Sequence, residues 1–301
     1  MTQPRRGFHI AGTHFPAPPL AAGLYLVATP IGNLGDITLR ALQTLAGVGL
    51  IACEDTRVSR RLLDHYGITT PTTAYHDHNA ATVRPALLKR IAEGTSVALI
   101  SDAGTPAISD PGFKLVREAH EAGLPVTALP GPSSVLTALV ASGLPTDRFL
   151  FEGFLPAKAT QRRNRIVELS RIPASLVLFE SGSRIAATLS ELADSLGERE
   201  AAICRELTKL HEEVRRAPLP ALAAHYAGDA ETRGEFVIVI APPGEAAAPG
   251  PDHVDQLIRA ALARVSVKDA VGEVVAATGL PRREVYKRAL ELARERNDAA
   301  P

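Results

Sequence analysis

Short apolar runs alternate with helix-like segments five times before residue 145. The clearest run, Val97–Ile100, is followed by the Gly-, Pro-, Ser- and Asp-rich stretch 101–112 and then by a helical pattern from Phe113. Asp110-Pro111 is typical of a helix N-cap with Pro at the first helical position. Repeated strand–loop–helix units are typical of a parallel doubly wound sheet. We therefore expect an α/β protein whose first domain has that architecture.

Changes in pattern along the chain predict five parts. We expect a disordered N-terminal extension over residues 1–22, an α/β domain over 23–147 and a second α/β domain with a mixed sheet over 148–241. A Pro-, Gly- and Ala-rich linker over 242–252 then leads to a helix-turn-helix-like segment over 253–296. A plain three-helix appendage is the alternative for this last segment.

Composition excludes some classes of function. The 33 basic and 33 acidic residues give a formal net charge of zero, so no global field attracts the chain to nucleic acid or to a membrane. No apolar run approaches the 18 residues of a membrane-spanning helix. The two cysteines, Cys53 and Cys204, lie on expected buried strands without CxxC spacing. They are typical of inert core thiols in a reducing cytoplasm.

Four loops rich in small or polar residues follow expected strands of the first domain. In an open α/β sheet, ligands bind beyond the carboxyl ends of the strands, where loop N–H groups and helix N-termini are available. Ordinary strand-to-helix connections are the alternative for each loop taken singly. The four loops are Thr29–Asn33, Cys53–Arg57, Ser101–Pro106 and Pro130–Ser134.

In this order and spacing, the four loops resemble the tetrapyrrole methylase superfamily, and within it the branch that methylates ribosomal RNA. The resemblance covers residues 23–241 and includes four further motifs, which are His76–Asn79, Phe151–Pro156, Glu180–Arg184 and Arg205–Lys209. The C-terminal helices also resemble the helix-turn-helix appendage of many members.

The resemblance implies the activity and its partners. S-adenosylmethionine would be the methyl donor, bound between the two α/β domains, and no metal would be needed. The acceptor would be the ribose 2′-oxygen of a cytidine in the decoding region of 16S rRNA, free or in the 30S subunit. The enzyme would be a cytoplasmic homodimer.

The donor site is also carried over from the resemblance. Ser133 and Ser134 could instead serve only as helix caps, and Asp102 could serve only to brace its loop. The residues expected to bind the donor are Pro30, Asp102, Ala103, Gly104, Ile108, Ser133, Ser134, Leu207, Gly234, Glu235 and Phe236.

A ribose hydroxyl is weakly acidic, so a base that accepts its proton can accelerate transfer by about 10²–10⁴-fold. The candidates at strand ends are Glu54, Asp55, Asp102 and His76, and we predict Asp55 and His76 as the catalytic residues. Asp55 could instead pair with a nearby arginine, and His76 could be an ordinary hydrogen-bonded loop residue. His76 and His78 with Asp77 do not form a convincing set of metal ligands.

Phosphate contacts must come from local positive charge, although arginine-rich helix faces are more often simply solvated. We predict RNA contacts from Arg57, Arg60, Arg162, Arg163 and Arg165, with Arg61, Arg282, Arg283, Lys287 and Arg288 as further basic residues. Three other functions remain open. They are a corrin-precursor C-methyltransferase, a diphthine synthase, and a non-enzymatic RNA-binding regulator that uses the C-terminal helices.

Overall fold

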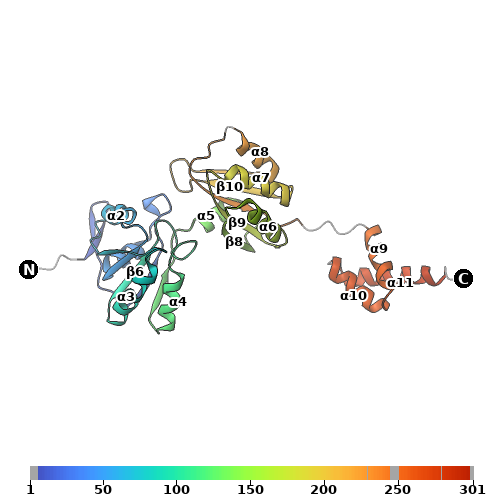
Figure 1. The fold of residues 1–301 in the computed structure, drawn as a ribbon, viewed down its shortest axis with the longest axis horizontal. Coiled ribbons are helices and arrows are strands. Elements are labelled where there is room, and N and C mark those ends of the chain that lie inside the picture. The colour runs from blue at the N-terminus through green and yellow to red at the C-terminus, as the bar shows by residue number, and fades with distance from the viewer. Residues whose placement is uncertain (1–5, 229, 245–250, 279, 299–301) are drawn as a thin grey trace, which may run out of the picture. The chain divides into compact units, whose positions relative to one another are not determined.

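The structure is a computed structural model that describes residues 6–228, 230–244, 251–278 and 280–298 (Figure 1). It divides into two compact bodies, residues 1–242 and residues 243–301. The first body contains two five-stranded sheets. None of the described helices is both long enough and apolar enough to cross a bilayer.

The first sheet is entirely parallel, which confirms the doubly wound prediction. Its spatial order is β5–β4–β6–β3–β7. The strands stay parallel, but the direction in which successive strands are added to the sheet changes beside β6 and β3. Loops at the carboxyl ends of these central strands are therefore well placed to form a ligand site. The strands are β3 (Gly23–Val27), β4 (Leu50–Cys53), β5 (Thr72–Ala74), β6 (Ser96–Ile100) and β7 (Val126–Leu129).

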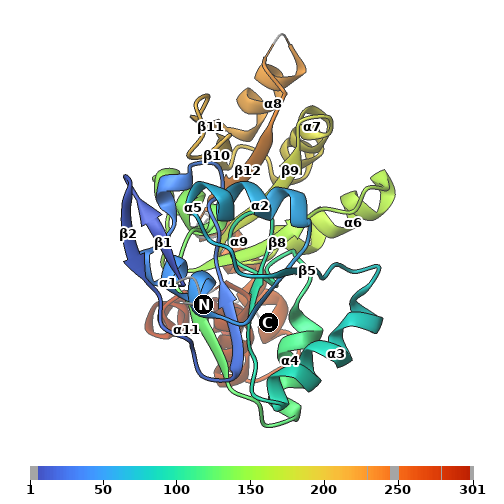
Figure 2. The same cartoon turned by 90° about the vertical axis from the view of Figure 1, so that its left-hand side faces the viewer.

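Helices cover both faces of this sheet because alternate strand residues point to opposite sides. Along β4, Ile51 and Cys53 pack with helices α1 and α2, whereas Leu50 and Ala52 pack with α3 and α4. Helices α3 and α4 lie side by side (Figure 2). The elements are η1 (Leu34–Asp36), α1 (Leu39–Gly47), α2 (Thr56–His65), α3 (Ala80–Ala92) and α4 (Phe113–Glu121).

The second sheet is mixed, as expected. Its order is β11–β10–β12–β9–β8, and only the β8–β9 pair is parallel. Helices α6, α7 and α8 pack on one face. The elements are β8 (Phe149–Phe154), α6 (Ala159–Ser170), β9 (Ser175–Ser181), α7 (Ile185–Leu196), β10 (Glu200–Arg205), β11 (Glu213–Pro218), α8 (Leu219–Ala227) and β12 (Glu235–Ile240).

A helix of the first domain covers the other face of the second sheet. Helix α5 (Ser134–Ala141) places Val135, Ala138 and Leu139 in one apolar cluster with Val177 of β9 and Val239 of β12. The N-terminus of α5 follows directly from the loop after β7. The shared cluster therefore brings the strand-end loops of the first sheet against the second sheet.

Part of the expected N-terminal disorder is replaced by structure. Strands β1 (Gly7–Ile10) and β2 (Thr13–Pro16) form an antiparallel hairpin around Ala11 and Gly12, both of which have positive φ. Phe8 is buried, and its ring stacks on Phe15 at 5.4 Å. The expectation of disorder is wrong over residues 7–16 because burial of Phe8 against α1 and α2 orders a segment of weak intrinsic preference. Residues 1–5 lie outside the described part of the chain.

The second body contains three helices around their own apolar core, α9 (Pro251–Leu262), α10 (Val267–Thr278) and α11 (Arg282–Asp298). Ser266 and Asp269 form a capping pair at the start of α10: the Asp269 backbone N–H donates to Ser266 Oγ at 3.3 Å, and that hydroxyl donates to Asp269 Oδ2 at 2.6 Å. Residues 245–250 of the expected linker lie outside the described residues, and α9 begins at Pro251.

Candidate active site

Loops of the first sheet and strands of the second enclose a cavity of about 290 Å³. Apolar wall is supplied by Phe154, Phe179 and Phe236. Eight of the residues expected at the donor site line it, namely Ala103, Gly104, Ile108, Ser133, Ser134, Gly234, Glu235 and Phe236. Of the other three, Leu207 lines a smaller neighbouring cavity of about 70 Å³, whereas Pro30 and Asp102 line neither.

The loop after β6 is pinned to the end of β3. Thr29 and Gly104 exchange two backbone hydrogen bonds of 2.9 Å, and Thr29 Oγ1 donates to the Ser101 carbonyl at 3.1 Å. Gly104 has φ +77°, a conformation that favours glycine, and a Cβ there would lie 3.3 Å from Ile31 Cγ2. These contacts present the backbone of residues 103–105 to the cavity.

Asp102 acts within the protein. Its Oδ1 accepts a hydrogen bond of 3.0 Å from the backbone N–H of Asp55, which ties the loop after β6 to the loop after β4. This contact favours loop bracing, one of the two roles weighed from the sequence. Direct donor binding by the Asp102 side chain stays a prediction.

Asp110 is a cavity residue that the sequence analysis missed, because Asp110-Pro111 matches the pattern of a helix N-cap. Helix α4 begins at Phe113 with Gly112 as its N-cap, so the prediction of an Asp110 cap is wrong. The chain turns earlier, through positive φ at Ala107 and Ser109, and Gly112 has φ +144°. A Cβ at Gly112 would lie 2.8 Å from Leu99 Cδ2, so this close approach favours glycine.

Asp110 is one of the residues that line the cavity, and it does not cap the helix. Burial, and then the negative charge of Glu54, raise its pKa to about 6. The pKa of Glu54 is itself raised, first by burial and then by the charge of Asp102. Asp-Pro before a helix is a strong capping pattern. The positive-φ turn decides between a helix cap and a cavity-lining residue, and the sequence does not reveal that turn.

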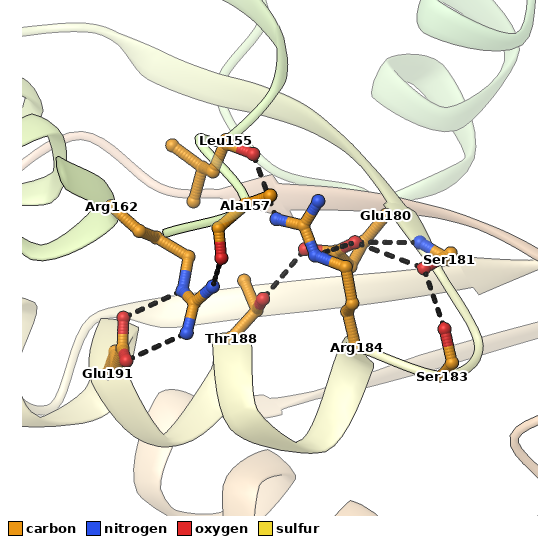
Figure 3. Close-up of polar contacts among 9 residues, drawn as sticks. All are labelled: Leu155, Ala157, Arg162, Glu180, Ser181, Ser183, Arg184, Thr188 and Glu191. Atoms are coloured by element: carbon orange, nitrogen blue, oxygen red, sulfur yellow. Dashed lines mark hydrogen bonds and ion pairs between the residues drawn. The ribbon is translucent and has the colours of Figure 1, made fainter. Parts of the chain in front are cut away.

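The opposite wall contains a buried carboxylate that is held by its own domain (Figure 3). Glu180 accepts hydrogen bonds from Thr188 Oγ1 at 2.6 Å and from the Ser181 backbone N–H at 2.8 Å. Arg184 Nε lies 3.3 Å from Glu180 Oε1, and Arg184 Nη2 donates to the Leu155 carbonyl at 2.8 Å. The Glu180–Arg184 motif thus fixes the end of β9 at the cavity. The sequence alone did not reveal this role of the motif.

Two close backbone approaches shape the same wall. A Cβ at Gly182 would overlap the carbonyl oxygen of Thr232. Gly234 has φ +115°, and a Cβ there would lie 2.7 Å from Glu206 Cγ. Next to it, Glu235 Oε2 accepts from Lys209 Nζ at 2.9 Å.

The charge of the cavity is one-sided. Its described lining residues include Asp110, Glu180 and Glu235 but no lysine, arginine or histidine, although Arg184 and Lys209 pair with Glu180 and Glu235 from outside the lining. Such a lining disfavours phosphate and favours a cation. The three phenylalanines add apolar surface suited to a flat ring system.

The two predicted catalytic residues lie away from this lining. Asp55 caps α2, and its carboxylate accepts from Arg57 N at 2.8 Å, Nε at 3.1 Å and Nη2 at 2.7 Å. The Arg57 hydrogen bonds lower the pKa of Asp55 to about 2, which makes its carboxylate a weak proton acceptor; the role of Asp55 as base stays a prediction. The Arg57 side chain is itself 89% exposed.

His76 stays a prediction. Its backbone N–H donates to Asn79 Oδ1 at 2.9 Å, and its ring meets that of His78 edge-on at 5.9 Å. Within the described chain, the buried Nδ1 of His76 has no hydrogen-bond partner. No group of three or more His, Cys, Asp or Glu side chains among the described residues is arranged to hold a metal ion.

Two of the arginines predicted to bind RNA form close ion pairs within the second domain. Arg162 is 7% exposed, and its guanidinium forms a two-pronged pair with Glu191, Nε to Oε2 at 2.8 Å and Nη2 to Oε1 at 2.9 Å (Figure 3). Arg165 pairs with Glu152 at 2.6 and 2.7 Å and with Glu168 at 2.6 Å. The prediction is therefore wrong for Arg162, whose guanidinium is buried in its pair with Glu191. The Arg165 side chain is 38% exposed, so an RNA contact from Arg165 stays a prediction.

The remaining basic residues are more accessible. The Arg163 side chain is 66% exposed and lies 3.7 Å from Glu191, and Arg60 forms an exposed pair with Asp64 at 3.0 Å. In the second body, Arg288 pairs with Asp255 and Glu291. The exposed basic residues among the described side chains of α11 are Arg282, Arg283, Lys287 and Arg294.

A parallel sheet and a mixed sheet that meet at an electronegative cavity define a methyltransferase of the tetrapyrrole methylase type. The family model described as Tetrapyrrole (Corrin/Porphyrin) Methylases matches residues 23–223, and that of the RsmI C-terminal HTH domain matches residues 247–293. The chain belongs to the tetrapyrrole methylase family, whose members are S-adenosylmethionine-dependent methyltransferases.

The chain is also similar to individual proteins over most of its length. The chain is 52% identical over 284 residues to the Ribosomal RNA small subunit methyltransferase I of Mesorhizobium japonicum, across 94% of this chain and 96% of the relative. The relative of that name from Halalkalibacterium halodurans is 44% identical, across 87% and 93% of the two chains.

Among solved structures, a uroporphyrin-III C-methyltransferase of Thermus thermophilus complexed with S-adenosylhomocysteine shares the fold. It has a TM-score of 0.51 and 22% identity, and the match covers 73% of this chain and 97% of that one.

Proposed function

We propose that this chain transfers a methyl group from S-adenosylmethionine to the ribose 2′-oxygen of a cytidine in the decoding region of 16S rRNA. The observation that carries the proposal is the cavity between the two sheets, which is lined by carboxylates and aromatic rings and by no described basic side chain. The printed names of the relatives support the small ribosomal subunit as the source of the acceptor.

The residues of the cavity fit the donor. S-adenosylmethionine carries a sulfonium and an ammonium, which suit the negative charge that Glu180 and Glu235 place around the cavity. The rings of Phe179 and Phe236 offer apolar surface to adenine. When bound, the donor supplies a methyl group on a positively charged sulfur.

The chain's own contribution is mainly positioning. The Thr29–Gly104 hydrogen bonds fix one wall, and the Glu180 network fixes the other. Holding nucleophile and methyl group in line between fixed walls lowers the barrier by about 7–11 kcal/mol.

For the RNA, we propose phosphate contacts from exposed Arg57, Arg60 and Arg163 and from the basic residues of α11. Among these, Arg163 lies on α6 of the second domain, next to the loop that leads from β8.

We also propose that the protein is a homodimer that acts in the cytoplasm. Edge strand β8 exposes Phe149 and Phe154, and α5 exposes Leu136 and Val140, which is 71% exposed. Large apolar side chains on an edge strand and a neighbouring helix are a common feature of subunit interfaces.

Two measurements test the proposed function. Calorimetry with S-adenosylmethionine should show binding to the purified protein, and S-adenosylmethionine labelled in its methyl group should transfer label to 30S subunits or to free 16S rRNA. Mass spectrometry of nuclease digests then locates the methylated ribose. Label on a base or on protein would refute ribose transfer, and absence of donor binding would refute the donor site itself.

A further inference from the structure

We propose that Asp110 is the catalytic base that accepts the proton of the acceptor hydroxyl. The inference deepens the proposed function and rests on it, because it presupposes an alcohol as the methyl acceptor. It is an alternative to the Asp55 assignment, which the contacts of Asp55 with Arg57 disfavour.

The three acidic residues that line the cavity differ in their hydrogen bonds and ion pairs. Glu180 already accepts from Thr188 and Ser181 and lies beside the Arg184 guanidinium. Glu235 pairs with Lys209. Among the described lining residues, Asp110 is the carboxylate beside which no ion pair with a basic side chain is found.

The surroundings of Asp110 make its carboxylate a stronger base than an ordinary aspartate. Burial is the largest cause of its raised pKa, and the negative charges of Glu54, from the loop after β4, and Asp102, from its own loop, add to it. The Ser101 hydroxyl lies within hydrogen-bonding reach and opposes their effect in part. Further out, Asp77 and His76 of the loop after β5 act on Glu54 with opposite signs.

The resulting pKa of about 6 suits proton transfer at neutral pH. At pH 7 most Asp110 side chains are ionised and can accept a proton, and their basicity exceeds that of a carboxylate with an unperturbed pKa of about 3.9. An Asp55-like carboxylate, with its pKa near 2, would be a far weaker proton acceptor.

The step balances without a further reactant. The hydroxyl O–H bond breaks and its proton moves to a carboxylate oxygen of Asp110, while an oxygen lone pair forms the new bond to the methyl carbon. The electron pair of the sulfur–methyl bond leaves with the sulfur, which becomes a neutral thioether. Asp110 then releases its proton to solvent.

The test compares the wild type with Asp110→Asn, Glu54→Gln and the control Asp194→Asn, an exposed carboxylate of α7 outside the cavity lining. Single-turnover methylation is measured at saturating donor between pH 5 and 8. We expect Asp110→Asn to lower the rate by about 10²-fold and to abolish its rise with pH. Glu54→Gln should shift that rise to lower pH, because it removes a negative charge that raises the pKa of Asp110.

Two readouts do not depend on turnover. Calorimetry should give a donor Kd for Asp110→Asn within about threefold of wild type, or about 0.7 kcal/mol. Thermal unfolding of the donor-free protein should show Asp110→Asn gaining stability relative to wild type as pH rises from 4 to above 6. The sign follows because a raised carboxyl pKa makes the folded state lose stability over that interval.

Each other outcome overturns the assignment. A rate within threefold of wild type shows that Asp110 is not the base, and a loss that higher donor concentration restores shows that it binds the donor. An inactive wild type that still binds donor refutes the proposed acceptor, and the base role with it. An active wild type with an active Asp110→Asn refutes the base role alone.

Discussion

Replacing Glu191 by Gln should destabilise the second domain far more than its surface position on α7 suggests. Glu191 is the partner of Arg162, and the two side chains are 16% and 9% exposed. The change keeps the shape of the side chain but removes the charge that compensates a buried guanidinium. Arg162 Nη1 would keep its hydrogen bond of 3.1 Å to the Ala157 carbonyl (Figure 3).

The magnitude follows from burial. Breaking a buried ion pair by removing one partner costs about 3–5 kcal/mol, because a charge is left without compensation. Glutamine can still accept one hydrogen bond from Arg162, so we expect a loss of about 3 kcal/mol. The control is Arg163→Gln, which removes a 66% exposed guanidinium 3.7 Å from the same carboxylate and should cost less than about 1 kcal/mol.

Urea unfolding followed by far-UV circular dichroism suits this chain, which has no tryptophan. Hydrogen bonding to Arg162 lowers the pKa of Glu191, so the difference should be complete above the ordinary glutamate pKa of about 4.3 and disappear as pH falls through the lowered value. The double variant Arg162→Met/Glu191→Leu should recover most of the stability. A loss for Glu191→Gln no larger than that for Arg163→Gln would refute the reasoning.

Three further changes test other parts of the structure. Gly182→Ala should weaken donor binding at least tenfold, about 1.4 kcal/mol by calorimetry, because the added methyl group displaces the loop that contains Thr232. The control Gly272→Ala, with open space around it, should leave the donor Kd unchanged. Arg163→Glu should reduce the slope of log K against log salt for RNA binding by about 0.7 per lost phosphate contact without lowering Tm, and an unchanged slope would remove Arg163 from the RNA surface. Phe8→Ala should cost about 3–5 kcal/mol in urea unfolding and Phe15→Ala clearly less, because Phe8 is 1% and Phe15 40% exposed; equal losses would contradict a structural role for the hairpin.

The α/β architecture could be predicted because it is encoded locally. Runs such as Val97–Ile100 are buried on both faces and are therefore apolar throughout, which distinguishes parallel strands from the helical segments between them. The loops at their carboxyl ends could be related to a site for the same reason, since parallel strands place those ends along one edge.

What could not be predicted depends on contacts between distant residues. Arg162 and Glu191 are 29 positions apart, and nothing in the basic sequence of α6 distinguishes a paired arginine from a free one. Phe8 becomes ordered only against helices formed by residues far along the chain. The role of Asp110 depends on positive φ at Ala107 and Ser109, for which neither residue type has a preference.

The placement of α5 has a consequence for dissecting the protein. This helix precedes residue 147, yet its apolar side chains complete the interior of the sheet that follows. A fragment that starts at residue 148 would leave Val177, Ala202 and Val239 exposed to water. The fragment that ends at residue 147 would carry α5 with its apolar face uncovered. The two halves are therefore a single unit for expression, and attempts to exchange one half between homologues should carry residues 134–141 along with the second half.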